Sequence, residues 1–355
     1  MSKKGLVSII TVNYNGWRDT CAMIDALWRH ETYPYEVIVI DNASAGDDVE
    51  QIENYLNKNR ASHPSATAST QSLSATASAQ SLSAAASTQS PSVASTQSLS
   101  AASTQSLSTA SAQSLRPFPH VNLIRSSKNL GFAGGNNLGL PVAKGEYLFF
   151  LNNDTEIAGP VLEVMVNRFL ADPQIGALSP RIELTHTPGL VQYAGDWRLT
   201  PITLRNRCPD AHLPNRDRIS REVEVVHGAA MMLRRDVVDR IGPMYEGYFL
   251  FYEEFDWSYA VLAAGYKVWF EAAATIYHKE GKSIGLRSPL RERYLVHSRL
   301  LFAKRWVRKP YLWLTILYLT IPVTLRNILT YAKKNRWDLV KATIQGLMTP
   351  PNLQR

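Results

Sequence analysis

The sequence predicts an α/β protein built on a mostly parallel central sheet with flanking helices, and three observations lead to this fold class. Apolar residues form short continuous runs, as in strands covered on both faces, at residues 6–12, 35–40, 121–124 and 147–151. Helical stretches at residues 19–30 and 133–143 separate these runs in pairs, and such strand–helix–strand units favour parallel pairing. Polar residues stand directly after the runs, where the carboxyl ends of parallel strands place ligand sites.

Composition places this fold in a large globular protein. The chain has 355 residues, of which 45% are hydrophobic, enough for one large or two modest domains with a substantial core. Its two cysteines, Cys21 and Cys208, lack the spacing of a metal or redox motif, which indicates reduced thiols in a cytosolic protein. The first apolar run has about seven residues, too few for the hydrophobic region of a signal peptide, so we expect no secretion.

Residues 61–115 interrupt the pattern with a low-complexity repeat. This segment contains no Asp, Glu, Lys, Arg or aromatic residue, and 46 of its 55 positions are Ala, Ser, Thr or Gln. Because this composition offers nothing for a hydrophobic core, we expect a disordered surface insertion. A Ser/Thr-rich tract that is modified by phosphate or sugar is the alternative.

The residues after the second and fourth runs suggest a nucleotide and a metal ion. An acid at the position of Asp41 typically accepts hydrogen bonds from a ribose or base, and the alternative is an N-cap for a helix near Ala45. The fourth run ends in Asn152-Asn153-Asp154, whose oxygens suit Mg²⁺ or Mn²⁺. Residues 129–137 are rich in glycines that would let the backbone approach a ligand, but they match neither G-x-G-x-x-G nor a P-loop.

An acidic cluster and a histidine follow later in the chain. Glu253, Glu254 and Asp256 lie within four positions at the start of a helical pattern that runs to Ala264. One of them could act as a general base, although acids in a first helical turn are also ordinary partners of the helix dipole. A lone histidine such as His278, after the apolar stretch 267–276, is more often structural than a ligand. The combination of these features is more specific than each feature alone.

Six segments in co-linear order resemble the family 2 glycosyltransferases, in particular the bacterial rhamnosyltransferase-like branch. They are VSIITVNYNG at 7–16, VIVIDNAS at 37–44, NLGFAGGNN at 129–137, LNNDT at 151–155, YEEFDW at 252–257 and IYHK at 276–279. The resemblance covers residues 5–305 once the insertion is excised. It implies a GT-A fold, a single α/β domain with a nucleotide-sugar site at the strand ends.

The resemblance also implies roles for individual residues. Those that would bind the nucleotide-sugar are Thr11, Asn13, Tyr14, Asp41, Asn129, Gly131, Asn137 and Asn153. Asp154 and His278 would hold Mg²⁺ or Mn²⁺ on the donor diphosphate. Many relatives have two or three acids where this chain has Asn152-Asn153-Asp154, which makes His278 more important here. Glu254 matches the position of the catalytic base, with Asp256 and Glu253 as the other candidates.

This set of residues suits sugar transfer with inversion. One carboxylate takes the proton of the attacking hydroxyl, and a divalent cation stabilises the charge on the leaving diphosphate. A glycosidase would instead need two carboxylates that flank the bond, and it would need no nucleotide site. The expected organisation is the first half of a nucleotide-binding region at 1–60, the insertion at 61–115, the rest of the catalytic domain at 116–305 and a tail at 306–355.

The tail carries the positive charge of the chain. Residues 282–355 contain 15 basic and two acidic residues, a balance of +13, so that residues 1–281 carry −5 of the total +8. Residues 310–325 are uncharged but interrupted by Pro322, and they fall short of the roughly 20 residues of a membrane span. We expect this segment to lie in the interface of an anionic membrane, and the alternative is a helix packed on the catalytic domain. Its aromatic residues lie among aliphatic ones, so we expect no nucleic acid partner.

The sequence as a whole predicts an inverting, metal-dependent glycosyltransferase, cytoplasmic and peripheral on the inner face of the cell membrane. Its donor would be a nucleotide-diphospho-sugar and its acceptor a hydroxyl of a lipid-linked or growing cell-surface polysaccharide. One alternative is a catalytically inactive scaffold that recruits partners. The other is a nucleotidyltransferase, but residues 13–17 lack the glycine- and basic-residue-rich loop expected of that class.

Overall fold

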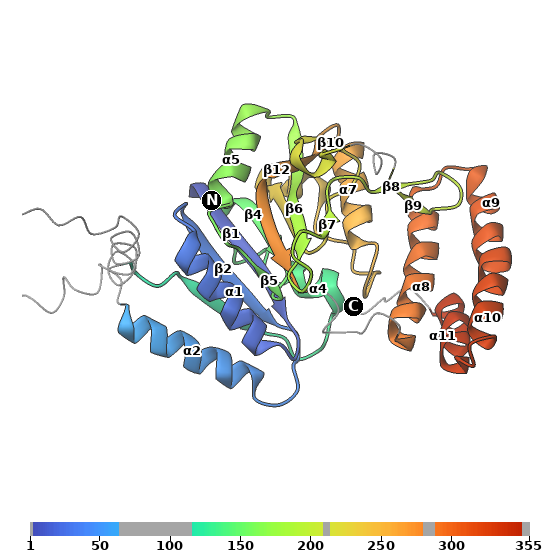
Figure 1. The fold of residues 1–355 in the computed structure, drawn as a ribbon, viewed down its shortest axis with the longest axis horizontal. Coiled ribbons are helices and arrows are strands. Elements are labelled where there is room, and N and C mark those ends of the chain that lie inside the picture. The colour runs from blue at the N-terminus through green and yellow to red at the C-terminus, as the bar shows by residue number, and fades with distance from the viewer. Residues whose placement is uncertain (1–2, 64–115, 209–213, 280–287, 350–355) are drawn as a thin grey trace, which may run out of the picture. The chain divides into compact units, whose positions relative to one another are not determined.

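The structure is a computed structural model that describes residues 3–63, 116–208, 214–279 and 288–349 (Figure 1). Contacts divide the chain into two compact units, residues 1–52 with 119–355, and residues 53–118. Helix α2 (Asp48–Ser62) begins in the first unit and ends in the second. In the second unit the rings of Tyr55 and Phe118 meet edge to face at 6.0 Å. Most of the repeat segment, residues 64–115, lies outside the described residues, so its expected disorder stays a prediction.

The first unit contains a sheet that confirms the expected fold class. Its ten described strands follow the order β10-β12-β6-β11-β4-β1-β2-β3, with β5 beside β12 and β7 beside β6. The four expected strands are β1 (Lys3–Asn13), β2 (Tyr35–Asp41), β3 (Val121–Arg125) and β4 (Gly145–Leu151), and they are mutually parallel. Apolar residues of β1, β2 and β4 are almost fully buried, because both faces of the sheet are covered.

The other half of the sheet mixes directions. Strand β11 (Ala230–Arg234) runs antiparallel between β4 and β6 (Ile175–Leu184), and β12 (Lys267–His278) runs parallel to β6. The remaining strands are short: β5 (Thr155–Glu156), β7 (Val191–Tyr193) and β10 (Arg221–Val223) in this sheet, and the separate pair β8 (Arg198–Leu199) and β9 (Asn206–Arg207). The sheet is therefore parallel on the β1 side and interrupted by one reversed strand at its centre.

Helices pack on the sheet and position its polar edge. Helix α4 (Gly131–Asn137) contacts β1 and β2, α6 (Arg235–Ile241) contacts β4 and β11, and α7 (Glu253–Ala263) contacts β6 and β12. The others that precede the tail are α1 (Trp17–His30), α5 (Leu162–Ala171) and the short η1 (Arg216–Arg218).

Helix α4 begins earlier and ends sooner than the expected helix over residues 133–143. Gly131 adopts a φ of +72°, and a Cβ on this residue would lie 2.1 Å from the carbonyl oxygen of Phe249. The next residue, Phe132, donates its N–H to the same oxygen at 2.9 Å. The close backbone approach that we expected for a ligand is thus made here to another part of the chain.

The C-terminal part of the described chain consists of helices joined by short turns. Helix α8 (Pro289–Trp306) is followed by α9 (Tyr311–Tyr318), the π turn η2 (Leu319–Val323) and α10 (Thr324–Ala332), and then by α11 (Trp337–Met348). Pro322 interrupts the apolar run in the sequence but does not end the helix, because α9, η2 and α10 form one continuous helix of 22 residues. A proline has no backbone N–H to donate, and the π turn accommodates the missing hydrogen bond within the helix.

We predict that Gly131→Ala destabilises the fold. A methyl group here meets a backbone oxygen at 2.1 Å, and the residue must also keep a positive φ, so we expect a loss of about 2–5 kcal/mol. Urea unfolding followed by circular dichroism measures this loss. Gly46→Ala is the matched control, because Gly46 has a φ of +79° but no atom within 4 Å of the position that a Cβ would take, and we expect a loss of about 1 kcal/mol there. Equal losses would show that the contact with Phe249 is unimportant.

Candidate active site

Side-chain hydrogen bonds connect the loops that follow the parallel strands. Asn13, at the end of β1, is fully buried, and its Nδ2 donates to Asp41 Oδ1 and to Ser44 Oγ, both at 3.0 Å. Its Oδ1 accepts from Thr20 Oγ1 at 2.8 Å. The other Asp41 oxygen accepts the backbone N–H of Ser44 at 3.2 Å, so Asp41 closes a turn and is not the N-cap of a helix. The carboxylate that we expect at the nucleoside is thereby held in one orientation.

The expected amide residues are placed by further hydrogen bonds of this kind. Asn129 Oδ1 accepts from Asn42 Nδ2 at 3.1 Å and from the N–H of Gly131 at 2.9 Å. Asn153 Nδ2 donates to Thr20 Oγ1 at 3.0 Å, which ties the end of β4 to α1. Asn137 bonds through both ends of its amide to the backbone of Met244, at 2.8 and 3.1 Å. The structure thus gives Asn129, Asn137 and Asn153 positions fixed by the protein itself, and their contact with a donor stays a prediction.

Thr11 and Tyr14 differ from the amides in their surroundings. The hydroxyl of Thr11 is buried, and it has no hydrogen-bond partner within the described part of the chain. Tyr14, one residue beyond β1, is exposed, which leaves its ring free to meet a ligand. Their expected roles at the nucleotide-sugar also stay predictions.

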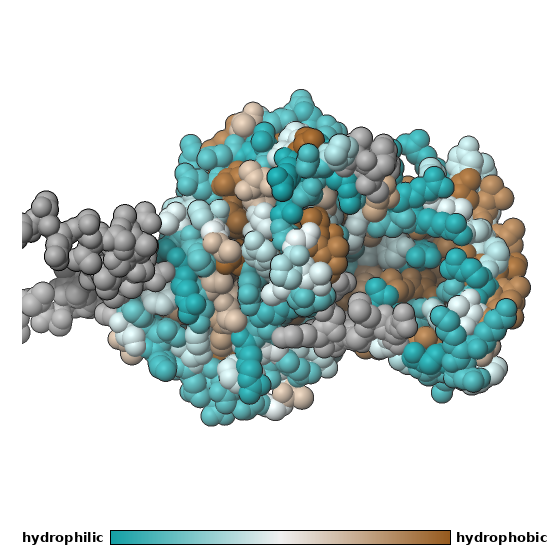
Figure 2. Space-filling model, in the orientation of Figure 1, coloured by the Kyte–Doolittle hydropathy of each residue, from teal (hydrophilic) through white to brown (hydrophobic). Residues whose placement is uncertain are grey.

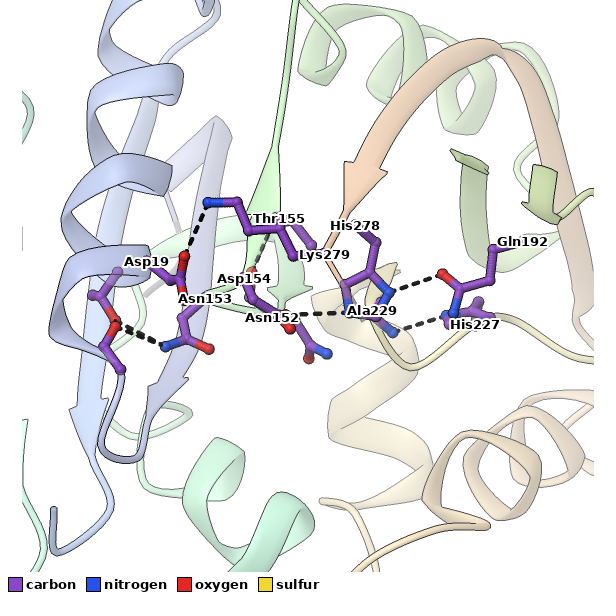
Figure 3. A network of polar contacts seen from close by, with 12 residues as sticks. Asp19, Asn152, Asn153, Asp154, Thr155, Gln192, His227, Ala229, His278 and Lys279 are labelled. Atoms are coloured by element: carbon purple, nitrogen blue, oxygen red, sulfur yellow. Dashed lines mark hydrogen bonds and ion pairs between the residues drawn. The ribbon is translucent and has the colours of Figure 1, made fainter. Parts of the chain in front are cut away.

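Asp154 and His278 meet at the junction of β5 and β12. Their closest atoms, Oδ1 of Asp154 and Nε2 of His278, lie 3.2 Å apart (Figure 3). The other ring nitrogen, Nδ1, lies 2.8 Å from the amide oxygen of Gln192, which accepts a hydrogen bond and so assigns the proton to Nδ1. With Nδ1 facing Gln192, Nε2 faces the carboxylate oxygen, and a proton or a cation can bridge these two atoms.

This donor set fits a divalent cation. A carboxylate oxygen and an imidazole nitrogen oriented by a hydrogen bond from its other nitrogen are ordinary metal ligands. Among the described residues no group of three or more His, Cys, Asp or Glu side chains could surround an ion. Two protein ligands are what Mg²⁺ or Mn²⁺ needs when phosphate oxygens and water complete its shell. Lys279, the next residue, adds positive charge nearby and pairs with Asp19 at 2.9 Å and Glu156 at 2.7 Å.

A turn between β10 and β11 brings in His227, which no sequence motif singles out. Its Nδ1 accepts the N–H of Ala229 at 3.1 Å, and its ring centre lies 6.3 Å from that of His278 and 4.7 Å from that of Trp197. Burial, together with the nearby His278, lowers the pKa of His227 to about 3, so this ring is neutral. The carbonyl of Ala229 accepts from the N–H of Asn152 at 2.9 Å, which fixes the turn beside the end of β4. Gln192 was likewise not expected here, since no motif surrounds either residue.

The structure distinguishes the three acids at the start of α7. Asp256 is buried, and its carboxylate accepts hydrogen bonds from Nε and Nη2 of Arg305, at 2.6 and 3.2 Å. It also accepts one from the hydroxyl of Tyr248 at 2.9 Å. Glu253 is also buried, and its Oε1 has no partner among the described residues. Burial and the neighbouring Glu254 raise the pKa of Glu253 well above its usual range. Asp256 therefore has a structural ion pair, whereas the Glu253 carboxyl is enclosed and its ionised form is disfavoured by burial.

Glu254 is the remaining acid, and it lies on the side of the turn at residues 227–229. Its side chain is partly exposed and stands beside Gly228, where a Cβ would be 3.8 Å from Glu254 Cβ. Burial raises its pKa to about 7. The backbone enters α7 through Phe251 and Tyr252, both with positive φ (70° and 74°), a conformation that non-glycine residues adopt only where the surroundings impose it. The turn thus lies between the Asp154–His278 pair and a carboxylate with a pKa suited to proton transfer.

Comparison by sequence gives one family match. A model of the family described as Glycosyl transferase family 2 matches residues 102–242, which is less than half of the chain. No curated protein matches the sequence.

Comparison of structures gives a shared fold with one solved protein and weaker matches to others, all at low sequence identity. The crystal structure of GalNAc-T7 with UDP, GalNAc and Mn²⁺ is 15% identical, with a TM-score of 0.55, and the match covers 84% of this chain. This chain spans only 50% of that structure. The mannosyltransferase PcManGT from Pyrobaculum calidifontis, in complex with GDP-Man and Mn²⁺, is 17% identical over 96% of this chain and 74% of its own, with a TM-score of 0.49. Residues 1–349 of TarS from S. aureus are 12% identical over 98% and 92%, with a TM-score of 0.46.

We predict that Asp154→Ala abolishes a stabilisation by Mn²⁺. An ion that binds only the folded chain at ten times its Kd adds about 1.4 kcal/mol to the free energy of unfolding, and removal of one of two protein ligands should eliminate this gain. Thermal unfolding over a Mn²⁺ titration is the measurement. The control is Asp239→Ala, since Asp239 is an exposed acid on α6, and it should keep the full gain. An unchanged Mn²⁺ response in Asp154→Ala would place the ion elsewhere.

Proposed function

We propose that this chain is a family 2 glycosyltransferase that transfers a sugar, with inversion, from a nucleotide-diphospho-sugar to an acceptor hydroxyl. The observation that carries this proposal is the placement of an oriented Asp154–His278 pair and a raised-pKa Glu254 on either side of one turn. This turn lies at the carboxyl edge of a parallel sheet, the usual ligand edge of such folds. The family match over residues 102–242 and the fold shared with GalNAc-T7 support the same activity.

The residues at this edge divide the work of the reaction. Asp154 and His278 would hold Mg²⁺ or Mn²⁺, which supplies positive charge for the leaving diphosphate when it is bound. Asp41 and Asn13, fixed by their mutual hydrogen bond, would orient the nucleoside. Glu254 takes the proton from the acceptor hydroxyl as its oxygen attacks the anomeric carbon.

We predict that Glu254→Gln lowers turnover by about 10² to 10⁴, the usual scale for loss of a positioned base, while donor binding is retained. The base must be ionised, so the rate of the unmodified chain should rise as the pH passes about 7 and then level off. The residual rate of Glu254→Gln should lack this rise. The assay is release of nucleoside diphosphate from a panel of nucleotide-sugars with Mn²⁺ between pH 5.5 and 9.

Asp256→Asn is the matched control for this test. It makes the same acid-to-amide change two positions away, but it weakens the pair with Arg305 and should act mainly on thermal stability. If Asp256→Asn loses the pH-dependent rate and Glu254→Gln keeps it, we have assigned the base wrongly. If no nucleotide-sugar is turned over or stabilises the chain, the proposed activity itself is wrong.

We also propose that the protein lies on the inner face of the cell membrane, to which it binds through the helix at residues 311–332. Within the described part of the chain it is the one helix long and apolar enough to cross a membrane, and only a small part of its apolar stretch is buried. It is thus longer than the 16-residue segment expected from the sequence. One face packs through Leu319 and Tyr318 on a hydrophobic cluster shared with α8.

The opposite face of this helix is apolar and uncovered. Its side chains are more than half exposed at Tyr311, Trp313, Leu314, Leu317, Ile321, Leu325 and Leu329. Figure 2 shows brown hydrophobic surface where α9 and α10 form the right-hand edge of the molecule. Basic residues stand at both ends of the helix, at Arg308, Lys309, Lys333 and Lys334. Because one face is already packed on α8, an orientation in the membrane interface suits this helix better than a span.

We predict that Leu317→Glu/Leu325→Glu releases the chain from vesicles that contain phosphatidylglycerol. Buried carboxylates oppose insertion of this face, and repulsion from the anionic lipid adds to the effect. Co-sedimentation over a salt series measures binding, which should weaken with salt in the unmodified chain without vanishing. Leu170→Glu is the control, because Leu170 on α5 is 66% exposed but lies outside the tail. Equal binding of all three proteins would show that the face does not meet lipid.

A further inference from the structure

A cavity with a volume of about 300 Å³ lies where the β8–β9 pair meets the tail. Arg205 and Asn206 contribute from the β8–β9 pair, Arg299 from α8, and Tyr318, Val323 and Arg326 from the long tail helix. The cavity is thus assembled from three segments, residues 203–206, α8 and the long tail helix, and each of them brings one arginine.

The charge of this cavity is not balanced by the protein. The described lining residues include no Asp or Glu, and none of the three arginines has a carboxylate partner within the described part of the chain. Arg299 donates its Nε to the hydroxyl of Tyr252 at 2.7 Å, and Arg326 donates to the amide oxygen of Asn327 at 3.0 Å, so both meet neutral groups. Three arginines around one cavity repel one another unless an anion lies among them. Their planar, forked donors match the oxygens of a phosphate.

One wall of the cavity is apolar and leads to the uncovered face of the tail helix. Tyr318 and Val323 line the cavity, and Ile321 and Leu325 on the same turns are more than half exposed. A second basic cavity, between α8, α10 and α11, is less suited to an anion: it contains Glu292, and its Arg336 pairs with Asp338 at 2.6 Å. The first cavity therefore combines uncompensated positive charge with an apolar path out of it.

The cavity is also connected to the acidic cluster. Tyr252, which receives the hydrogen bond from Arg299, is the residue directly before α7, whose first two residues are Glu253 and Glu254. Arg305, two turns further along α8, holds Asp256 in the same helix. A ligand bound by Arg299 would thus lie one side chain away from the segment that carries the proposed base.

We propose that this cavity binds the phosphate or diphosphate of a lipid-linked acceptor, with its apolar chain along Tyr318 and Val323. This inference rests on the proposed function, because it names the class of acceptor that the transferase would use. The phosphate anchors the acceptor on the arginines, and the sugar beyond it extends toward Glu254. An ordinary phospholipid headgroup shares the phosphate chemistry, and the test separates the two sources.

The test measures binding of farnesyl diphosphate to the full chain by calorimetry, in EDTA and without donor. This probe joins a diphosphate to a soluble apolar chain, and farnesol and inorganic pyrophosphate each present one half of it. We expect farnesyl diphosphate to bind more tightly than either half. Arg205→Gln/Arg326→Gln should weaken it roughly 10²- to 10⁴-fold, the scale of two lost charge-assisted hydrogen bonds.

Two further proteins make the result specific. Arg308→Gln/Lys333→Gln removes the same charge from exposed residues outside the cavity and should change the affinity less than threefold. Asp154→Ala should leave the affinity for farnesyl diphosphate unchanged, which separates this cavity from the donor side. The result of the binding test then does not depend on whether the proposed transfer occurs. An equal loss in the charge control, or equal binding of farnesol, would overturn the proposal. So would a cavity variant that keeps its affinity for farnesyl diphosphate but loses phosphatidylglycerol vesicles, since this result would assign the arginines to a lipid headgroup.

Discussion

The reversed strand β11 is the constraint on which the site depends. It lies antiparallel between β4 and β6, so the turn that precedes it, residues 227–229, emerges at the same edge as the carboxyl ends of the parallel strands. There the carbonyl of Ala229 accepts a hydrogen bond from Asn152, the ring of His227 lies beside that of His278, and Gly228 lies beside Glu254. A parallel strand at this place would send its preceding turn to the opposite edge. The Asp154–His278 pair and the acidic helix are neighbours because this strand is reversed.

Electrostatic partners then decide what each acid can do. A buried carboxylate needs a cation or hydrogen-bond donors, because the loss of hydration otherwise forces it to take up a proton. Asp256 has Arg305 and Tyr248, Glu253 has no partner for Oε1 among the described residues, and Glu254 keeps partial access to solvent. Three acids within four positions thus become an ion pair, an enclosed carboxyl whose pKa is raised by burial, and a carboxyl with a pKa of about 7.

The same helix that supplies Arg305 joins the tail to the sheet. Residues of α8, such as Phe302, share a hydrophobic cluster with Tyr248, Phe255 and Leu319, so the acidic helix and the apolar tail helix have one packing core. Tyr252, at the strained entry to α7, packs in this cluster, and its hydroxyl accepts a hydrogen bond from Arg299. The surface proposed to meet lipid and the site proposed to transfer a sugar are therefore held in a fixed relation by close packing, not by a linker.

The sequence by itself determined the four parallel strands, the acids and amides at their ends, and the basic, apolar tail, because period, burial and charge are local properties of the chain. Only the tertiary structure placed Gln192 and His227 beside His278, since neither stands in a motif and their partners lie far away in the chain. It also gave Gly131 a backbone contact that no local pattern encodes, and carried the tail helix through Pro322. Arg205, Arg299 and Arg326 reach one cavity only after three segments pack together, which is a long-range consequence of folding and leaves no signal in sequence spacing.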